Sequence, residues 1–375
     1  MLKTYYRILL SAWKTFGFGR VFLLYLLVPF FLLFTRVTLF LDGIFFPKYR
    51  KLQVTSPVFI IAHPRSGTTF LHQLLTQTGE FVAFEAWQLF LPSLTARALL
   101  KPIVNYLIRK NHNTIVPSQA GSETRLDGVK TEEWLFLHKL DTQFLMTFSP
   151  LCFDEQEHPE LRLYDQQSES RRQSSMGFFK GCLQRQMYYT GKSQVIAKMH
   201  FSTHRIKTLL EAFPDAKFIY LVRSPHETVP SRLSLNRNVL NRLWGLENIT
   251  PEKLKRWQER KYLYSIDLYR YFYDVHKTNQ VSSNSVMVLP YNELLIDLNK
   301  AFEKIVAFTG IKPGDRLRQA IEHRAQLQKD YKRKHQVMKL EDFGLTEEQI
   351  SEDFSFVFEE YGFDKCLSQG QLSKK

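Results

Sequence analysis

The sequence predicts an α/β protein in which a parallel sheet is flanked by helices, with a helical insertion and an N-terminal membrane-associated helical segment. Three observations predict this fold class. From residue 57 onward, short continuous apolar runs alternate with helical patterns, as buried parallel strands and their crossover helices do. Residues 86–190 have mostly helical patterns and offer no clear strand. Residues 1–50 differ from the rest because they are both basic and apolar.

The N-terminal segment, residues 1–50, carries seven basic side chains against one acid, Asp42. Its uncharged run, residues 21–34, has 14 residues, which is fewer than the ~20 needed to cross a bilayer. Pro29 is expected to kink a helix here. A basic, aromatic and apolar helix of this kind predicts a segment that lies in the membrane interface, or dips into it, on the cytoplasmic side. The alternative is a core helix packed on the domain.

The remainder, residues 51–375, is expected to fold as one domain. Its strands are predicted at residues 58–62, 195–199, 217–222 and 285–289. Helices are predicted at residues 68–78, before Phe213, and at residues 292–308. We expect the insertion at residues 86–190 to cover the edge of the sheet where a ligand binds.

The charge and the cysteines narrow the class of ligand. The net charge is +14, which suits a phosphate-bearing ligand and an anionic membrane surface. Neither zinc-finger spacing nor a long basic tail occurs, so we expect no nucleic acid partner. Cys152, Cys182 and Cys366 are widely spaced, which predicts isolated thiols in a reducing compartment and no metal site.

The most informative stretch is the turn between the first strand and its helix. It reads His63-Pro64-Arg65-Ser66-Gly67-Thr68-Thr69. Backbone N–H groups and a helix N-terminus at such a turn bind an anion, and glycine lets the backbone approach it closely. Arginine adds a planar cation, and the threonines add hydroxyl donors. A nucleotide-binding Walker A loop is excluded, because this turn has one glycine and its cation precedes it.

Two motifs together resemble the donor site of PAPS-dependent sulfotransferases. The Pro-Arg-Ser-Gly-Thr-Thr turn resembles their 5′-phosphosulfate loop, which implies that residues 65–69 bind the nucleotide. Arg223, at the end of a predicted strand, is followed eight residues later by Ser231. This spacing resembles the family's 3′-phosphate site. The resemblance covers roughly residues 57–365 and implies the family's P-loop-like fold.

Two further matches concern the catalytic residues and a C-terminal segment that closes over the nucleotide. Lys198-Met199-His200 resembles the family's Lys-x-His, which supplies a cation for the transition state and a base. The C-terminal run at residues 331–335 contains Lys332 and Lys334 and precedes Phe343-Gly344-Leu345. It resembles a segment that closes over the nucleotide in bacterial members of the family.

The resemblance implies a sulfuryl transfer from PAPS to a hydroxyl or amine, by in-line displacement, with PAP as the product. Arg65 and Lys198 would stabilise the charge that develops on the transferred group and the leaving oxygen. A sulfuryl group carries one negative charge, so no metal is expected. The acceptor is open, and the apolar N-terminus favours a lipid or a membrane-presented glycan over other small molecules.

The general base has three candidates. His200 follows Lys198 in the motif just described. Glu85 lies about twenty residues past the loop arginine, as the base of tyrosylprotein and heparan-type sulfotransferases does. Glu132 and Glu133 lie on the insertion, where the alternative is a solvated helix face.

Two other functions compete with this interpretation. A P-loop kinase, or another nucleotide-dependent phosphotransferase, would place an aspartate for magnesium at the end of a strand, where this sequence has Arg223. A non-catalytic membrane scaffold could keep the fold and the anion site without activity.

Overall fold

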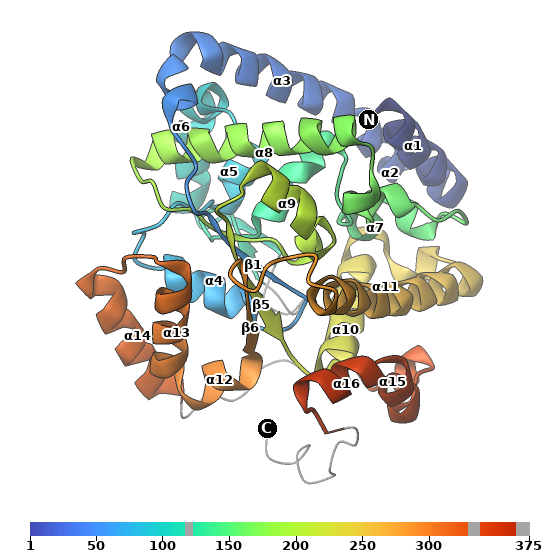
Figure 1. Cartoon of the computed structure of the whole chain (residues 1–375). Coiled ribbons are helices and arrows are strands. Elements are labelled where there is room, and N and C mark those ends of the chain that lie inside the picture. The colour runs from blue at the N-terminus through green and yellow to red at the C-terminus, as the bar shows by residue number, and fades with distance from the viewer. Residues whose placement is uncertain (117–122, 329–337, 365–375) are drawn as a thin grey trace.

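A computed structural model of the chain describes residues 1–116, 123–328 and 338–364. Its main sheet has four parallel strands in the order β4-β1-β5-β6 (Figure 1). The predicted parallel α/β class is confirmed, and each predicted strand is present within one residue of its expected ends. The strands are β1 (Val58–Ala62), β4 (Ile196–Lys198), β5 (Lys217–Val222) and β6 (Val286–Pro290).

The central strand β1 divides the core into two layers. All five of its residues are buried, which explains the continuous apolar run in the sequence. Phe59 and Ile61 face one layer, and Val58, Ile60 and Ala62 face the other.

Helices cover both faces of the sheet (Figure 1). The layer that contains Phe59 and Ile61 is packed by helices α8 to α11, and the opposite layer by α4, α13 and α14. The helix after β1 and the helix after β5 therefore lie on opposite faces. Neighbouring strands of this kind open a crevice at their carboxyl ends, where α/β proteins bind ligands. The bounds are α4 (Thr68–Thr76), α8 (Glu169–Thr190), α9 (Ile206–Ala212), α10 (Pro225–Trp244), α11 (Pro251–Lys277), α13 (Leu298–Thr309) and α14 (Asp315–Gln328).

Two details of the sheet's surroundings differ from the prediction. The single helix expected at residues 292–308 is two helices, α12 (Tyr291–Ile296) and α13. The break occurs because the Asp297 side chain accepts from the Lys300 N–H and so caps a new helix. The insertion also contains a short antiparallel pair that was not predicted, β2 (Thr114–Val116) with β3 (Thr124–Arg125).

The rest of the insertion is helical, as expected. It contains α5 (Ala86–Phe90), α6 (Leu94–Arg109) and α7 (Leu145–Phe148) before α8. A 3-10 helix, η3 (Glu132–Lys139), lies beside β4, and this contact brings the insertion to the carboxyl end of the sheet.

The N-terminal segment forms three helices, α1 (Leu2–Phe16), α2 (Arg20–Leu26) and α3 (Val28–Phe45). Pro29 lies in the first turn of α3, where its missing N–H costs nothing, so the expected kink is instead a helix start after Leu27. By length and composition the stretch Arg20–Phe45, 26 residues long, could cross a membrane, which the 14-residue run alone could not. It lies along the outside of the protein against α6, at the opposite end from α12 and α16 (Figure 1).

Asp42 connects this segment to the domain. It is fully buried and accepts from Arg185 Nε at 2.6 Å and from the Ser93 hydroxyl at 2.8 Å. The backbone N–H groups of Leu94 and Thr95 donate to the same carboxylate. The single acid of the segment therefore caps α6 and pairs with α8.

The C-terminal helices α15 (Glu347–Asp353) and α16 (Ser355–Tyr361) pack on α10 and α11. Phe343 and Leu345 belong to the C-terminal segment that was expected to close over the nucleotide. Both are buried in the same core layer as Phe59 and α10. Lys332 and Lys334 lie outside the described residues. The next described residue, Met338, donates its N–H to Ser234 Oγ at 3.0 Å, one helical turn from Ser231 on α10.

Candidate active site

The turn after β1 has the backbone of an anion-binding loop. Arg65 and Gly67 both have positive φ, at 78° and 93°, and Gly67 is the N-cap of α4. A Cβ atom on Gly67 would lie 2.4 Å from ring carbons of Tyr291. Only glycine allows this conformation with the ring so close. Ser66 is fully buried.

The first residue of the turn, His63, has a structural role. Its ring stacks on Tyr269 with centroids 4.8 Å apart, and its Nε2 lies 3.2 Å from Arg232 Nη1. Burial, and then the charge of Arg232, hold the pKa of His63 well below its usual value. His63 is therefore a neutral imidazole that packs the start of the turn against Tyr269 and Arg232.

The two predicted phosphate motifs meet in space. Arg65 Nε donates to Ser231 Oγ at 2.9 Å, and Arg223 Nη1 donates to the Arg65 carbonyl at 3.2 Å. These contacts join the turn after β1 to the end of β5 and the start of α10, at the carboxyl ends of the two strands. The sequence motifs are 158 residues apart, measured from Arg65 to Arg223.

Two residues that the sequence analysis missed complete this corner. Glu227 accepts from Arg223 Nη2 at 2.6 Å, one turn into α10. The ring of Tyr291, the first residue after β6, lies 4.4 Å from the Arg223 guanidinium carbon. An acid four residues after a strand-end arginine is a recognisable signal for the first contact. No sequence signal predicts that Tyr291 covers Gly67.

Lys198 lies on the other side of the turn. It is 4% exposed, and its Nζ donates to Thr69 Oγ1 at 3.1 Å. Burial, followed by the charge of Lys130, lowers the pKa of Lys198 to about 7. Its ammonium group is therefore poised to gain or lose a proton near neutral pH.

His200, two residues further, is partly exposed. Burial of its ring, with the charges of Lys198 and Arg232, lowers the pKa of His200 well below its usual value. Its ring centroid lies 5.5 Å from that of Phe144 and 4.5 Å from that of Phe201.

Glu85 is the N-cap of α5 and forms a capping box with Gln88. Its Oε2 accepts from Trp87 Nε1 at 2.6 Å, and burial is the main reason that the pKa of Glu85 is raised. Its backbone pairs with Val129, beside Lys130, whose charge acts on Lys198. Glu85 is therefore near the insertion side of the site, although no contact of its side chain with Arg65 or His200 is present among the described residues.

The carboxylates of Glu132 and Glu133 are buried, so the alternative of a solvated helix face is wrong. Glu132 accepts from the Lys198 backbone N–H at 2.7 Å. Glu133 accepts from the N–H and hydroxyl of Ser202, and burial raises its pKa to about 7. Both carboxylates hold the segment around Lys198 and His200 in place.

The insertion adds a patch of aromatic side chains beside His200, here called the aromatic wall. Neighbouring rings along the wall have centroids 4.9–6.2 Å apart. Phe90, Trp134 and Phe148 are partly exposed, whereas Phe144 and Phe201, the two rings next to His200, are buried. The hydroxyl of Tyr25 on α2 donates to the Phe148 carbonyl, which connects this wall to the N-terminal segment. The 31 phenylalanines of the chain are a sequence signal for aromatic packing of this kind. The wall consists of Phe90, Trp134, Phe144, Phe148 and Phe201.

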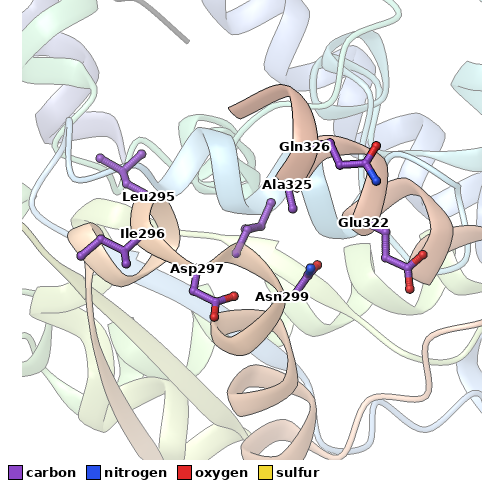
Figure 2. A pocket seen from close by; sticks show the side chains of 8 residues that line it. Leu295, Ile296, Asp297, Asn299, Glu322, Ala325 and Gln326 are labelled. Carbon is purple, nitrogen blue, oxygen red and sulfur yellow. The ribbon is translucent and has the colours of Figure 1, made fainter. Parts of the chain in front are cut away.

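Two other hollows lie away from these motifs. One, of about 450 Å³, lies between α12–α13 and α14, and Asp297 and Glu322 point toward it (Figure 2). A second, of about 690 Å³, includes Gln194 and lies at the amino ends of the strands. Within the described part of the chain, no group of three or more His, Cys, Asp or Glu side chains could hold a metal ion.

Comparison with known proteins gives a consistent result. Residues 57–315 match the model of the sulfotransferase family. Over 321 residues the chain is 26% identical to the omega-hydroxy-beta-dihydromenaquinone-9 sulfotransferases of Mycobacterium bovis and Mycobacterium tuberculosis, which covers 82% of this chain and 76% of theirs.

Two crystal structures have the same fold. Sulfotransferase STF1 from Mycobacterium tuberculosis superimposes with a TM-score of 0.68 at 17% identity, over 94% of this chain and 92% of that one. Sulfotransferase STF9 from Mycobacterium avium gives 0.65 at 17% identity, over 88% and 82%.

Proposed function

The chain belongs to the sulfotransferase family, and from this premise we propose that it transfers a sulfuryl group from PAPS to the hydroxyl of an apolar, membrane-borne acceptor. The observation that carries the proposal is the meeting of Arg65, Ser231 and Arg223 at one crevice, with Lys198 bonded to Thr69 on its other side. Each of these groups can bind an anionic oxygen.

In this proposal the two ends of the donor occupy the two motifs. The backbone of the turn, with Thr68 and Thr69, holds the 5′-phosphosulfate at the N-terminus of α4. Arg223 and Ser231 hold the 3′-phosphate, which takes over the contact that Arg223 makes with Glu227. Lys332 and Lys334 cover the nucleotide, a role favoured by the bond from Met338 to Ser234.

The transfer replaces one bond to sulfur with another and moves one proton. The acceptor oxygen attacks sulfur, the bond from sulfur to the bridging phosphate oxygen breaks, and the hydroxyl proton passes to the base. Arg65 neutralises charge on the sulfuryl oxygens, and protonated Lys198 stabilises the leaving oxygen. By analogy with phosphoryl transfer, the rate comes mainly from positioning and charge stabilisation.

We assign the base to Glu85 in preference to His200. Efficient bases have a pKa near the working pH. Burial moves the pKa of Glu85 upward, toward neutrality, whereas burial and nearby cations move that of His200 down and away from it. Substrate binding must bring the Glu85 carboxylate toward the reacting hydroxyl.

The acceptor class follows from the aromatic wall. Phe144 and Phe201, the rings next to His200, are buried, and the wall continues from them to the partly exposed rings of Phe148, Trp134 and Phe90. We propose that these partly exposed rings hold an apolar chain that ends in a hydroxyl. The mycobacterial relatives, by name, act on a hydroxylated menaquinone derivative, which is also lipid-like. We propose that residues 1–50 keep the enzyme on the cytoplasmic side of a membrane, where such acceptors are found, and that residues 51–375 carry the sulfotransferase domain.

The donor is tested by thermal unfolding of the full chain with PAP, ATP with magnesium, or GTP. PAP alone should raise the melting temperature, and Arg223→Ala should weaken PAP binding by roughly 2–4 kcal/mol because a buried phosphate loses a charged partner. Arg242→Ala, on the exposed last turn of α10, the helix that begins two residues after Arg223, is the control and should bind normally. Stabilisation by ATP with magnesium instead would favour a kinase. PAP binding without transfer to any acceptor would favour the scaffold.

A further inference from the structure

We infer that the N-terminal helices dock side-on onto an anionic bilayer, through one apolar stripe of α3, and do not cross it. This inference rests on the proposed membrane attachment and specifies its geometry. The stripe consists of Phe30, Leu33, Val37, Phe40 and Ile44, which are 48–71% exposed.

The stripe has the period of one helix face. Its members follow each other at intervals of three and four residues, so they share one side of α3. The buried residues Thr35, Thr38 and Asp42 have the same spacing and fall on the opposite side. One side of α3 therefore packs against the domain, and the other is apolar and exposed.

The contacts between α3 and the domain extend along the helix and are not confined to one end. The ring of Phe31 lies 5.6 Å from that of His138, and eleven residues later Asp42 pairs with Arg185. At 1.5 Å per residue these contacts are roughly 16 Å apart along the axis. A spanning helix would carry the buried pair Asp42–Arg185 and helices α6 and α8 into the hydrocarbon with it, at a high cost.

The neighbouring helices have faces that fit the same orientation. On α1, Ile8 and Ala12 are buried against the domain while Tyr6 and Trp13 are 64% and 49% exposed. Tyr and Trp are favoured at the level of lipid headgroups. On α6, which packs against α3, Leu99, Ile103 and Tyr106 form a second exposed stripe.

Charge identifies the partner as an anionic bilayer. Lys14, Arg20, Arg36, Lys48 and Arg50 are exposed, whereas the only acid of the segment, Asp42, is buried with Arg185. Basic side chains beside an apolar face are attracted to anionic headgroups. A second copy of this chain would bring the same positive charges face to face, which opposes a dimer through this surface.

Vesicle flotation of the full chain tests the surface. With phosphatidylcholine vesicles that contain phosphatidylglycerol the protein should float, and removal of phosphatidylglycerol or addition of salt should weaken this binding. Phe30→Ser combined with Phe40→Ser should lower the partition coefficient by about tenfold or more. Ile296→Ser is the matched control, because Ile296 is 85% exposed on α12, away from the stripe, and should leave flotation unchanged. Equal flotation of the Phe30/Phe40 double variant, or its conversion from dimer to monomer, would overturn the inference.

Labelling with a membrane-impermeant maleimide separates side-on docking from spanning. Lys14→Cys and Lys48→Cys, each in a Cys366→Ser background, place thiols before and after the stretch Arg20–Phe45. Side-on docking predicts that both react in inverted membrane vesicles and that neither reacts in intact cells. Reaction of the two sites from opposite sides would refute it.

PAP binding measured on the same variants keeps this inference distinct from the proposed function. The Phe30/Phe40 double variant should retain normal PAP affinity, because neither residue contacts the crevice. A protein that floats but does not bind PAP would refute the sulfuryl transfer and leave the docking surface intact. A protein that binds PAP but does not float would refute the docking surface alone.

Discussion

Lys198 provides a quantitative test of the site because its charge depends on pH. Its pKa, lowered to about 7 by burial and by Lys130, means that about half of the empty protein carries the charge at pH 7 and about a tenth at pH 8. A bound 5′-phosphate would restore the pKa toward its ordinary value. We therefore expect PAP binding to take up close to one proton at pH 8.

The affinity should fall as the pH rises. If only the protonated form binds PAP well, the association constant decreases by about 50-fold from pH 7 to pH 9, and tenfold for each further unit. The sign follows from the group: the favourable charge is present below pH 7 in the empty protein and is lost above it. Calorimetry in buffers of different ionisation enthalpy measures the proton uptake directly.

Two variants provide controls for this titration. Lys198→Arg keeps the charge at every pH, so its PAP affinity should lose most of the dependence between pH 7.5 and 9. Lys130→Gln removes the neighbouring charge, so the pKa of Lys198 should rise and the proton uptake at pH 8 should shrink. Unchanged uptake in Lys198→Arg would refute the assignment of Lys198 to the donor site.

Four further predictions concern the loop, the base and the N-terminal connection. Gly67→Ala should reduce PAP affinity at least about tenfold, because its φ is 93° and a Cβ would meet Tyr291; Gly191→Ala, with φ 71° and open space, should cost only about 1 kcal/mol of stability and leave binding intact. Arg65→Ala should abolish transfer in a turnover assay yet keep measurable PAP binding, since Arg223 and the backbone donors remain. Glu85→Gln should lower turnover about 100-fold with little change in PAP binding, whereas a comparable loss in His200→Asn alone would move the base to His200. Asp42→Asn should lower the free energy of unfolding by about 3 kcal/mol in urea titrations, because Arg185 is left buried without its charge partner; Glu259→Gln, which removes the exposed pair with Lys255, should change it by less than about 0.5 kcal/mol.

The sequence predicted the elements whose signal is local. The strands around Phe59 and Ile219 are continuous apolar runs because they are buried on both faces. The anion-binding turn is visible because it needs an arginine and a glycine two positions apart, directly before a helix. The eight-residue spacing from Arg223 to Ser231 likewise reflects one strand end and one helix turn.

The sequence did not predict contacts that depend on tertiary packing. Nothing near residue 291 indicates that Tyr291 covers Gly67, since the two belong to different strands' loops. The burial of Glu132 and Glu133 was also hidden, because their backbone partners, Lys198 and Ser202, are more than 60 residues away. One helix was predicted at residues 292–308 because the amphipathic periodicity continues past Asp297, although Asp297 ends one helix and caps the next.

The bond between Asp42 and Arg185 also has a consequence for the order of events during synthesis. These partners are 143 residues apart, so at ordinary translation rates Asp42 leaves the ribosome roughly 7–30 seconds before Arg185. During that interval the buried side of α3 has no folded domain to pack against, whereas its apolar stripe can already bind a membrane. We therefore expect the nascent chain to reach the bilayer first and the sheet to assemble at its surface, with the closing of the Asp42–Arg185 pair as a late step in maturation.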